Sequence, residues 1–146
     1  MILEKIKSQL KHAMKKSEKE NVLAIRNILE KIKNVQVDYK EELSEDQIIK
    51  IIAKYTKQLK DSIQQFKDGG RDDLVEKESY ELKIISQFLP EQLSKEEIDI
   101  IVQKIITDLK ATSMSDMGMV IKKTMEITKG SADGKLISEL ARNYLK

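Results

Sequence analysis

The chain has 146 residues, of which 27 are Lys or Arg and 25 are Asp or Glu, giving a formal net charge of +2. The absence of cysteine excludes a disulfide framework, a thiol nucleophile and a cysteine-ligated zinc site. No apolar run approaches the roughly 20 residues that a membrane-spanning helix needs, so we predict a soluble, cytoplasmic protein that does not bind membranes.

The first half of the chain has the pattern of long helices, because glycine and proline are absent from its first 68 residues. Apolar residues recur at three- and four-residue steps over 2–14 and again over 22–35, which predicts two amphipathic helices. The short alternation over 35–39 has no strand partner, so we interpret it as a helix end. Ser44-Glu45-Asp46-Gln47 has the capping-box pattern and opens a third helix, which Gly69-Gly70 ends.

A fourth helix is predicted after Gly70, running to Leu89, where Pro90 stops it. A second capping box, Ser94-Lys95-Glu96-Glu97, opens a fifth helix. Two more helices are expected at about 116–127 and 133–146, the last with Tyr144 facing inward.

These elements predict an all-α protein. Its first four helices form a helical body over residues 1–90, and the last three form a small tail over residues 94–146. The two ends are basic: residues 1–33 hold nine Lys or Arg against four acids, and residues 110–146 hold seven against four. The middle of the chain is close to neutral.

The turn from Lys129 to Lys135 joins the last two predicted helices and is the part of the chain most like a site. A helix N-terminus offers unpaired backbone amides to an anion, and the two lysines flank it. The turn is not a nucleotide-binding P-loop, because three residues separate Gly130 from Gly134 where that motif has four, and Leu136 replaces its Ser or Thr. We therefore predict no nucleotide cofactor.

A structural interpretation of the same turn stays open beside the phosphate site. In it, Gly130 is the left-handed C-cap of one helix and Ser131 or Asp133 is the N-cap of the next. Lys129 and Lys135 are then only solvated side chains.

Other candidate residues favour structural roles. His12 lies off the apolar face of its helix and has no second metal ligand near it in sequence, so no metal site is predicted. Arg71 is expected to tie its turn to the body, although an exposed Arg also suits a phosphate. Acidic pairs at helix starts favour the helix dipole over acid-base chemistry; they are Glu41-Glu42, Glu45-Asp46, Asp72-Asp73 and Glu96-Glu97.

The methionines of the tail allow two interpretations. Met114, Met117, Met119 and Met125 would suit an adaptable surface for a protein partner. We favour core filling, because Met117, Val120 and Ile121 form a helical stripe.

Several short motifs occur in a fixed order along the chain. They are Phe66, Gly70-Arg71-Asp72-Asp73-Leu74, Lys77-Glu78, Glu81-Leu82, Phe88-Leu89-Pro90-Glu91-Gln92-Leu93-Ser94, Asp116-Met117-Gly118 and Lys129-Gly130-Ser131-Ala132-Asp133-Gly134-Lys135. Together they resemble the GatB/YqeY family, specifically the free-standing YqeY-like proteins. The resemblance implies a helical body and a three-helix tail, similar to the tail of the B subunit of the glutamine-dependent tRNA amidotransferase, where the tail engages tRNA. That subunit's chemistry belongs to a separate cradle that these 146 residues do not contain.

The leading hypothesis is a non-catalytic RNA-binding or tRNA-associated accessory protein that needs no cofactor. Its predicted RNA contacts are Lys122, Lys123, Lys129, Gly130, Lys135, Arg142 and Lys146. One alternative is an adaptor that docks on a translation-related protein. Another, suggested by the family label alone, is a carbon-nitrogen ligase with glutamine as amide donor, for which the sequence offers no nucleophile. The oligomeric state is left open.

Overall fold

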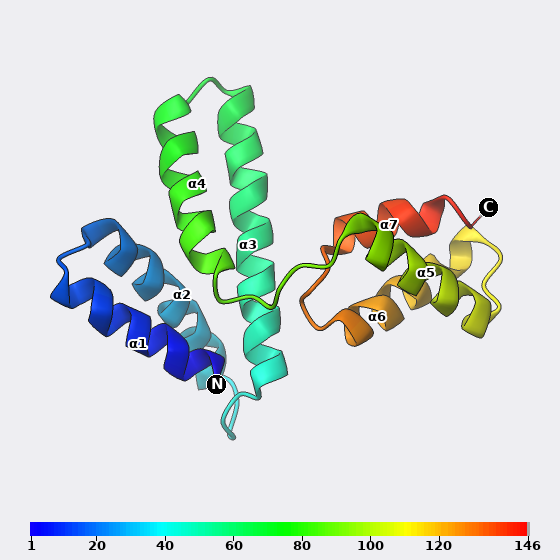
Figure 1. Ribbon diagram of the computed structural model, residues 1–146, viewed down its shortest axis with the longest axis horizontal. Coiled ribbons are helices and arrows are strands. Elements are labelled where there is room, and N and C mark those ends of the chain that lie inside the picture. Colours follow the sequence, from blue (N-terminus) through cyan, green and yellow to red (C-terminus); the bar gives the residue numbers. More distant parts are fainter. Residues whose placement is uncertain (146) are drawn as a thin grey trace. The chain divides into compact units, whose positions relative to one another are not determined.

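The structure is a computed structural model that describes residues 1–145. Within them it contains seven α-helices, one short 3₁₀ helix and no strand, which confirms the predicted all-α fold (Figure 1). The elements are α1 (Ile2–Lys15), α2 (Lys19–Val37), α3 (Glu45–Asp68), α4 (Asp72–Ser86), α5 (Lys95–Leu109), η1 (Met114–Asp116), α6 (Met117–Thr128) and α7 (Gly134–Arg142). None of the helices described is long and apolar enough to cross a membrane.

Both predicted capping boxes are present, and they set the starts of α3 and α5. The Ser44 hydroxyl accepts from the Gln47 amide at 3.2 Å, while the Gln47 side chain accepts from the Ser44 amide at 2.8 Å. At α5 the Ser94 hydroxyl accepts from the Glu97 amide at 3.1 Å, and the Glu97 carboxylate accepts from the Ser94 amide at 3.0 Å. Each box satisfies two amides that the helix start leaves without helical partners.

Helix α3 ends where its glycine signal predicts, whereas helix α4 ends before the residue that its proline signal predicts. Helix α3 ends as predicted at Gly69-Gly70, where Gly70 has a φ of 71°, a left-handed conformation that glycine enters without a Cβ clash. Helix α4 stops at Ser86, before the predicted end at Leu89. Tight turns follow it because the residue before a proline, here Leu89 before Pro90, is disfavoured in the helical conformation.

The chain divides into two compact units, an N-terminal unit over Met1–Leu89 and a C-terminal unit from Pro90 onward. In the N-terminal unit α1 packs against α2, α3 packs against α4, and α2 also contacts α4 (Figure 1). The apolar stripes of these four helices meet in one core. Its buried residues are Ile6, Ala13, Ala24, Ile25, Ile28, Ile32, Ile48, Ile52, Leu59, Ile85 and Phe88.

Polar side chains also join three helices of the N-terminal unit. The Glu81 carboxylate of α4 accepts from the Asn27 side-chain amide of α2 at 3.0 Å and from the Tyr55 hydroxyl of α3. Burial and the Glu81 carboxylate raise the pKa of Tyr55 far above its usual range, so the phenol stays protonated and donates. The Lys31 ammonium lies 4.7 Å from the centre of the Tyr55 ring, a cation–π arrangement.

In the C-terminal unit α5, α6 and α7 pack on one another around a second apolar core. Its buried residues are Ile98, Val102, Ile105, Val120, Ala132, Ile137, Leu140, Ala141 and Leu145. Thr124 and Thr128 of α6 are buried as well, and their hydroxyls donate to the carbonyls one turn earlier at 2.7 Å and 2.9 Å. Burial of these hydroxyls therefore leaves no donor unpaired.

The last helix is shorter than predicted, because α7 ends at Arg142. Tyr144 was expected to face inward, but it is exposed, and its hydroxyl donates to the Asp99 carboxylate of α5 at 2.8 Å. Leu145 occupies the buried position beside it. The end of the described chain is thus held by a hydrogen bond and one apolar anchor.

Candidate functional site

The chain between α6 and α7 turns through two consecutive left-handed residues. Lys129 has a φ of 45° and is the C-cap of α6, and Gly130 follows with a φ of 86°. The predicted C-cap at Gly130 therefore lies one residue too late. Gly130 takes the second left-handed position, where a side chain would be strained.

Two carbonyls of this turn are occupied by the segment that enters the C-terminal unit. The Gln92 side-chain amide donates to the Gly130 carbonyl at 2.9 Å, and the Leu93 amide donates to the Ser131 carbonyl at 2.8 Å. Ala132, the next residue, is buried. The turn is therefore shaped by contacts within its own unit.

The start of α7 carries a carboxylate cap. Asp133 is the N-cap residue, and its Oδ1 accepts from the Lys135 amide at 3.0 Å. This confirms Asp133 as the cap in the structural interpretation of the turn. A carboxylate here compensates the positive helix end, so an incoming anion would meet its negative charge.

The predicted cationic contacts lie on α6, α7 and the turn between them. Lys122, Lys123, Lys129, Lys135 and Arg142 are all exposed, and none of them forms an ion pair with another described residue. Lys135 and Arg142 are seven residues apart and therefore share one face of α7. Lys146, the remaining predicted contact, lies outside the described residues.

One packing contact places the cations of α6 near the start of α7. A Cβ placed on Gly134, at the start of α7, would lie 3.7 Å from Sδ of Met125 on α6. Lys122 precedes Met125 by about one turn, and Lys129 follows it by about one turn. The start of α7, with Lys135, is thus next to the part of α6 that carries these lysines.

Three acids of the C-terminal unit are bonded to backbone amides at helix starts. Besides Glu97 and Asp133, the Asp116 carboxylate accepts from the Thr112 amide at 3.0 Å and from the Ser113 amide at 3.3 Å. These backbone hydrogen bonds lower the pKa of Asp116 below its usual value. Glu97 and Asp133 thus cap helices as predicted, whereas the role of Asp116 was not predicted.

The charge of the C-terminal unit is segregated between its helices. Residues 117–145, which include α6 and α7, carry five cations and three acids. Helix α5 has the opposite balance, with two cations and four acids. The cationic surface is therefore confined to α6, α7 and their connection.

The core-filling prediction is correct for Met117 and wrong for the other three methionines of the tail. Met114, Met119 and Met125 are exposed, and only Met117 packs partly into the core. The predicted core stripe of Met117, Val120 and Ile121 is confirmed, because all three pack in the C-terminal core. Ile127 on the same helix is 57% exposed.

His12 and Arg71 do not add to a site. His12 is exposed on α1, and no group of three or more His, Cys, Asp or Glu among residues 1–145 is placed to hold a metal ion. Arg71 was expected to tie its turn to the body, but its guanidinium lies 3.3 Å from the Asp73 carboxylate, within the same turn. Because Asp73 offers a carboxylate only two positions along the chain, the Arg71 side chain stabilises the turn itself.

Comparison with known proteins identifies related sequences. A family model described as "Yqey-like protein" matches residues 3–145. Three relatives share the name "Altered inheritance of mitochondria protein 41, mitochondrial". The Kluyveromyces lactis protein is 40% identical over 75% of this chain and 61% of its own length. The Saccharomyces cerevisiae protein is 34% identical over 82% of this chain and 66% of its own length. The Pyrenophora tritici-repentis protein is 29% identical over 95% of this chain and 78% of its own length.

These relatives correct the predicted cytoplasmic location, and the matched share of their length limits which of their properties apply to this chain. Their names place them in mitochondria, so the predicted cytoplasmic location is wrong. Composition misled here because a chain without cysteine or an apolar span suits any aqueous compartment. The match also spans only 61% of the Kluyveromyces lactis protein, about three fifths of its length.

Proposed function

The chain belongs to the YqeY-like protein family, and we propose that it is a non-catalytic RNA-binding accessory protein whose C-terminal unit contacts structured RNA such as tRNA. The family is related to the C-terminal tail of the B subunit of the tRNA-dependent amidotransferase. The observation that carries the proposal is the set of exposed cations on α6, α7 and their connection, none of which is neutralised by a described acid.

Side chains, rather than loop amides, are the phosphate contacts in this proposal. The Ser131 amide already donates to the Thr128 carbonyl and the Lys135 amide to the Asp133 carboxylate, whose negative charge lies at the start of α7. Lysine and arginine side chains can follow a phosphate backbone without reading its sequence. Lys129 and Lys135 flank the turn and are the central contacts, with Arg142 continuing along α7.

The test is tRNA binding by the full chain over a series of salt concentrations. We expect Lys129→Glu/Lys135→Glu to weaken binding and to flatten the plot of log affinity against log salt by about 0.7–0.9 for each phosphate that the variant no longer neutralises. Circular dichroism of the variant should keep the helical spectrum, because both side chains are exposed.

The matched control is Lys104→Glu/Lys110→Glu on the acidic helix. Lys110 is a left-handed C-cap with a φ of 53°, like Lys129, and Lys104 is an exposed helical lysine, like Lys135. The control makes the same change of charge in the same unit, and Lys50→Glu on α3 makes a single change in the other unit. The proposal fails if the control double variant weakens binding as much as Lys129→Glu/Lys135→Glu, or if both retain wild-type affinity.

The protein-docking adaptor is the second candidate, because Met119 and Ile127 are exposed on α6. Its expected signature is binding that changes little with salt, since apolar contacts are not screened by ions. Met119→Gln/Ile127→Gln should leave tRNA binding unchanged under the RNA proposal. A loss of tRNA binding in this variant would count against phosphate-dominated contact.

A further inference from the structure

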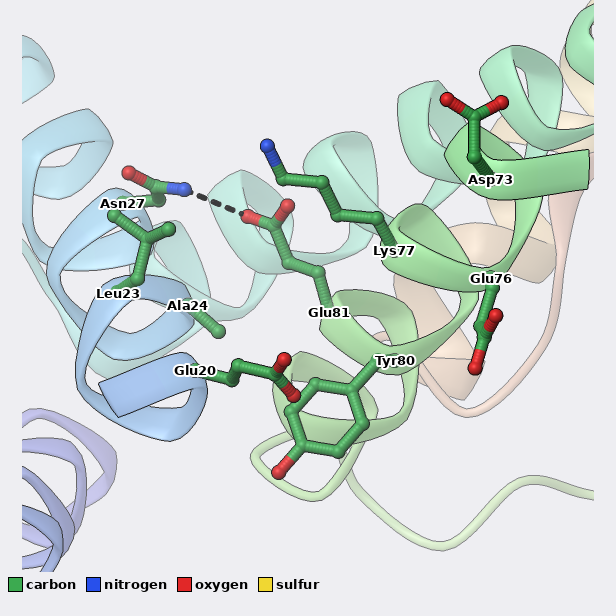
Figure 2. A pocket seen from close by; sticks show the side chains of 9 residues that line it. All are labelled: Glu20, Leu23, Ala24, Asn27, Asp73, Glu76, Lys77, Tyr80 and Glu81. Atoms are coloured by element: carbon green, nitrogen blue, oxygen red, sulfur yellow. Dashed lines mark hydrogen bonds between the residues drawn. The ribbon is translucent and has the colours of Figure 1, made fainter. Parts of the chain in front are cut away.

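A cavity of about 450 Å³ lies between α2 and α4 of the N-terminal unit (Figure 2). Its volume is in the range of small-molecule sites. None of the predicted RNA contacts lines it. The RNA-binding proposal therefore does not explain this cavity.

The charged groups of this cavity are mainly carboxylates. Glu20 of α2 lines one wall, and Asp73, Glu76 and Glu81 of α4 line the other, with Lys77 as the one lining cation. Asp73 is paired with Arg71 in its own turn. The other three carboxylates have no ion pair with a described residue.

Glu81 offers a further acceptor to the cavity. The hydrogen bonds from Asn27 and Tyr55 both go to its Oε1, so Oε2 has no donor among residues 1–145. Burial and the Glu81 carboxylate raise the pKa of the adjacent Glu78, as expected beside uncompensated negative charge.

The carboxylates are spread along the cavity rather than gathered at one point. Within residues 1–145 no group of them is placed to hold a metal ion. Apolar surface from Leu23, Ala24 and the Tyr80 ring also lines the cavity. A ligand that fits has several cationic groups separated by hydrocarbon, because each carboxylate then finds a charge and the apolar surface finds methylenes.

We propose that this cavity binds a linear polyamine, with ammonium groups at Glu20 on α2 and at Glu76 and Glu81 on α4, and methylenes against Leu23 and Tyr80. Figure 2 shows the Lys77 side chain extending alongside Glu81 toward α2. Lys77 is an internal cation that competes with the ligand for these carboxylates. The site is independent of the tail surface.

The test is isothermal titration of the full chain with spermidine. Glu20→Gln/Glu76→Gln, which removes two exposed carboxylates that pair with ammonium groups of spermidine in this proposal, should weaken binding about tenfold. Lys77→Gln should strengthen binding about threefold, because it removes the competing cation. A gain in affinity does not arise from damage to the fold, so this second variant is informative even if the first is destabilised.

Two controls distinguish binding of spermidine in the cavity from nonspecific attraction of a cation to carboxylates. Glu96→Gln/Glu126→Gln removes two exposed carboxylates from the C-terminal unit and should leave spermidine affinity unchanged. Putrescine has the charge of Mg²⁺ but carries it at two separated ends, so it should compete with spermidine and Mg²⁺ should compete far less. Equal competition by Mg²⁺, equal loss in the control variant, or weaker binding by Lys77→Gln would each overturn the proposal.

Discussion

Several carboxylates have different partners in the two units of this protein. In the N-terminal unit Glu81 accepts hydrogen bonds from side chains of two other helices, and further carboxylates face an open cavity. In the C-terminal unit Glu97, Asp116 and Asp133 accept from backbone amides at helix starts. These three acids lie at helix starts, and in residues 117–145 the five cations outnumber the three acids. The same residue type can thus leave one unit suited to cations and the other to anions.

The largest expected effect tests the apolar core of the N-terminal unit against an exposed position of the C-terminal unit. Ile52 is fully buried in the N-terminal unit, and Ile52→Ala should lower the free energy of unfolding by about 2–5 kcal/mol. Urea unfolding, with hydrogen exchange to locate the loss in residues 1–89, measures it. Ile127→Ala, at an exposed position of the C-terminal unit, should change stability by less than about 0.5 kcal/mol. Similar losses in the two variants would contradict the assignment of the core.

A smaller effect distinguishes two roles of Asp133, which caps α7 and adds a negative charge to the turn. Asp133→Ala should cost about 1 kcal/mol of stability because it removes the cap of α7, whereas Asp133→Asn keeps a good cap and should cost much less. Both changes remove a negative charge from the turn, so both should strengthen tRNA binding if Lys129 and Lys135 contact phosphate. Thermal melts and tRNA titrations of the two variants give the comparison. Unchanged tRNA affinity in both variants would show that the turn is not part of the RNA-binding surface.

The smallest effect concerns acid stability of the C-terminal unit. The backbone hydrogen bonds of Asp116 hold its pKa below the unfolded value, so they stabilise the fold above about pH 4 and are lost as the pH falls through the folded pKa. Asp116→Asn should therefore differ most from wild type at neutral pH and least in acid. Melts at neutral and acidic pH test this. Asp108→Asn removes an exposed carboxylate without such a bond and is the control; a difference that grows in acid would contradict the expected sign.

The helix starts were predictable because their signals are local. Ser44 and Ser94 with the residue three positions later define each cap within four residues of chain. The ends of α4 and α7 were not, since both helices stop before their apolar pattern does. The exposure of Tyr144 depends on Asp99, a partner 45 residues away.

The polar features of the N-terminal unit were missed for the same reason. Tyr55, Asn27 and Glu81 lie on three helices, and Asn27 is 54 residues from Glu81, so no spacing rule connects them. The cavity was missed because it depends on how α2 packs against α4. By contrast, the exposure of Lys135 and Arg142 followed from their place opposite the apolar stripe of α7.

The hydrogen bonds from Gln92 and Leu93 to the α6–α7 turn decide where a stand-alone fragment of the C-terminal unit should begin. A fragment cut at Ser94 would keep all three helices but leave the Gly130 and Ser131 carbonyls without these donors, at about 0.5–1.5 kcal/mol each. A fragment cut at Pro90 keeps both donors. Truncation at the visible start of α5 would thus yield a weakened fragment, although it removes no residue of any helix.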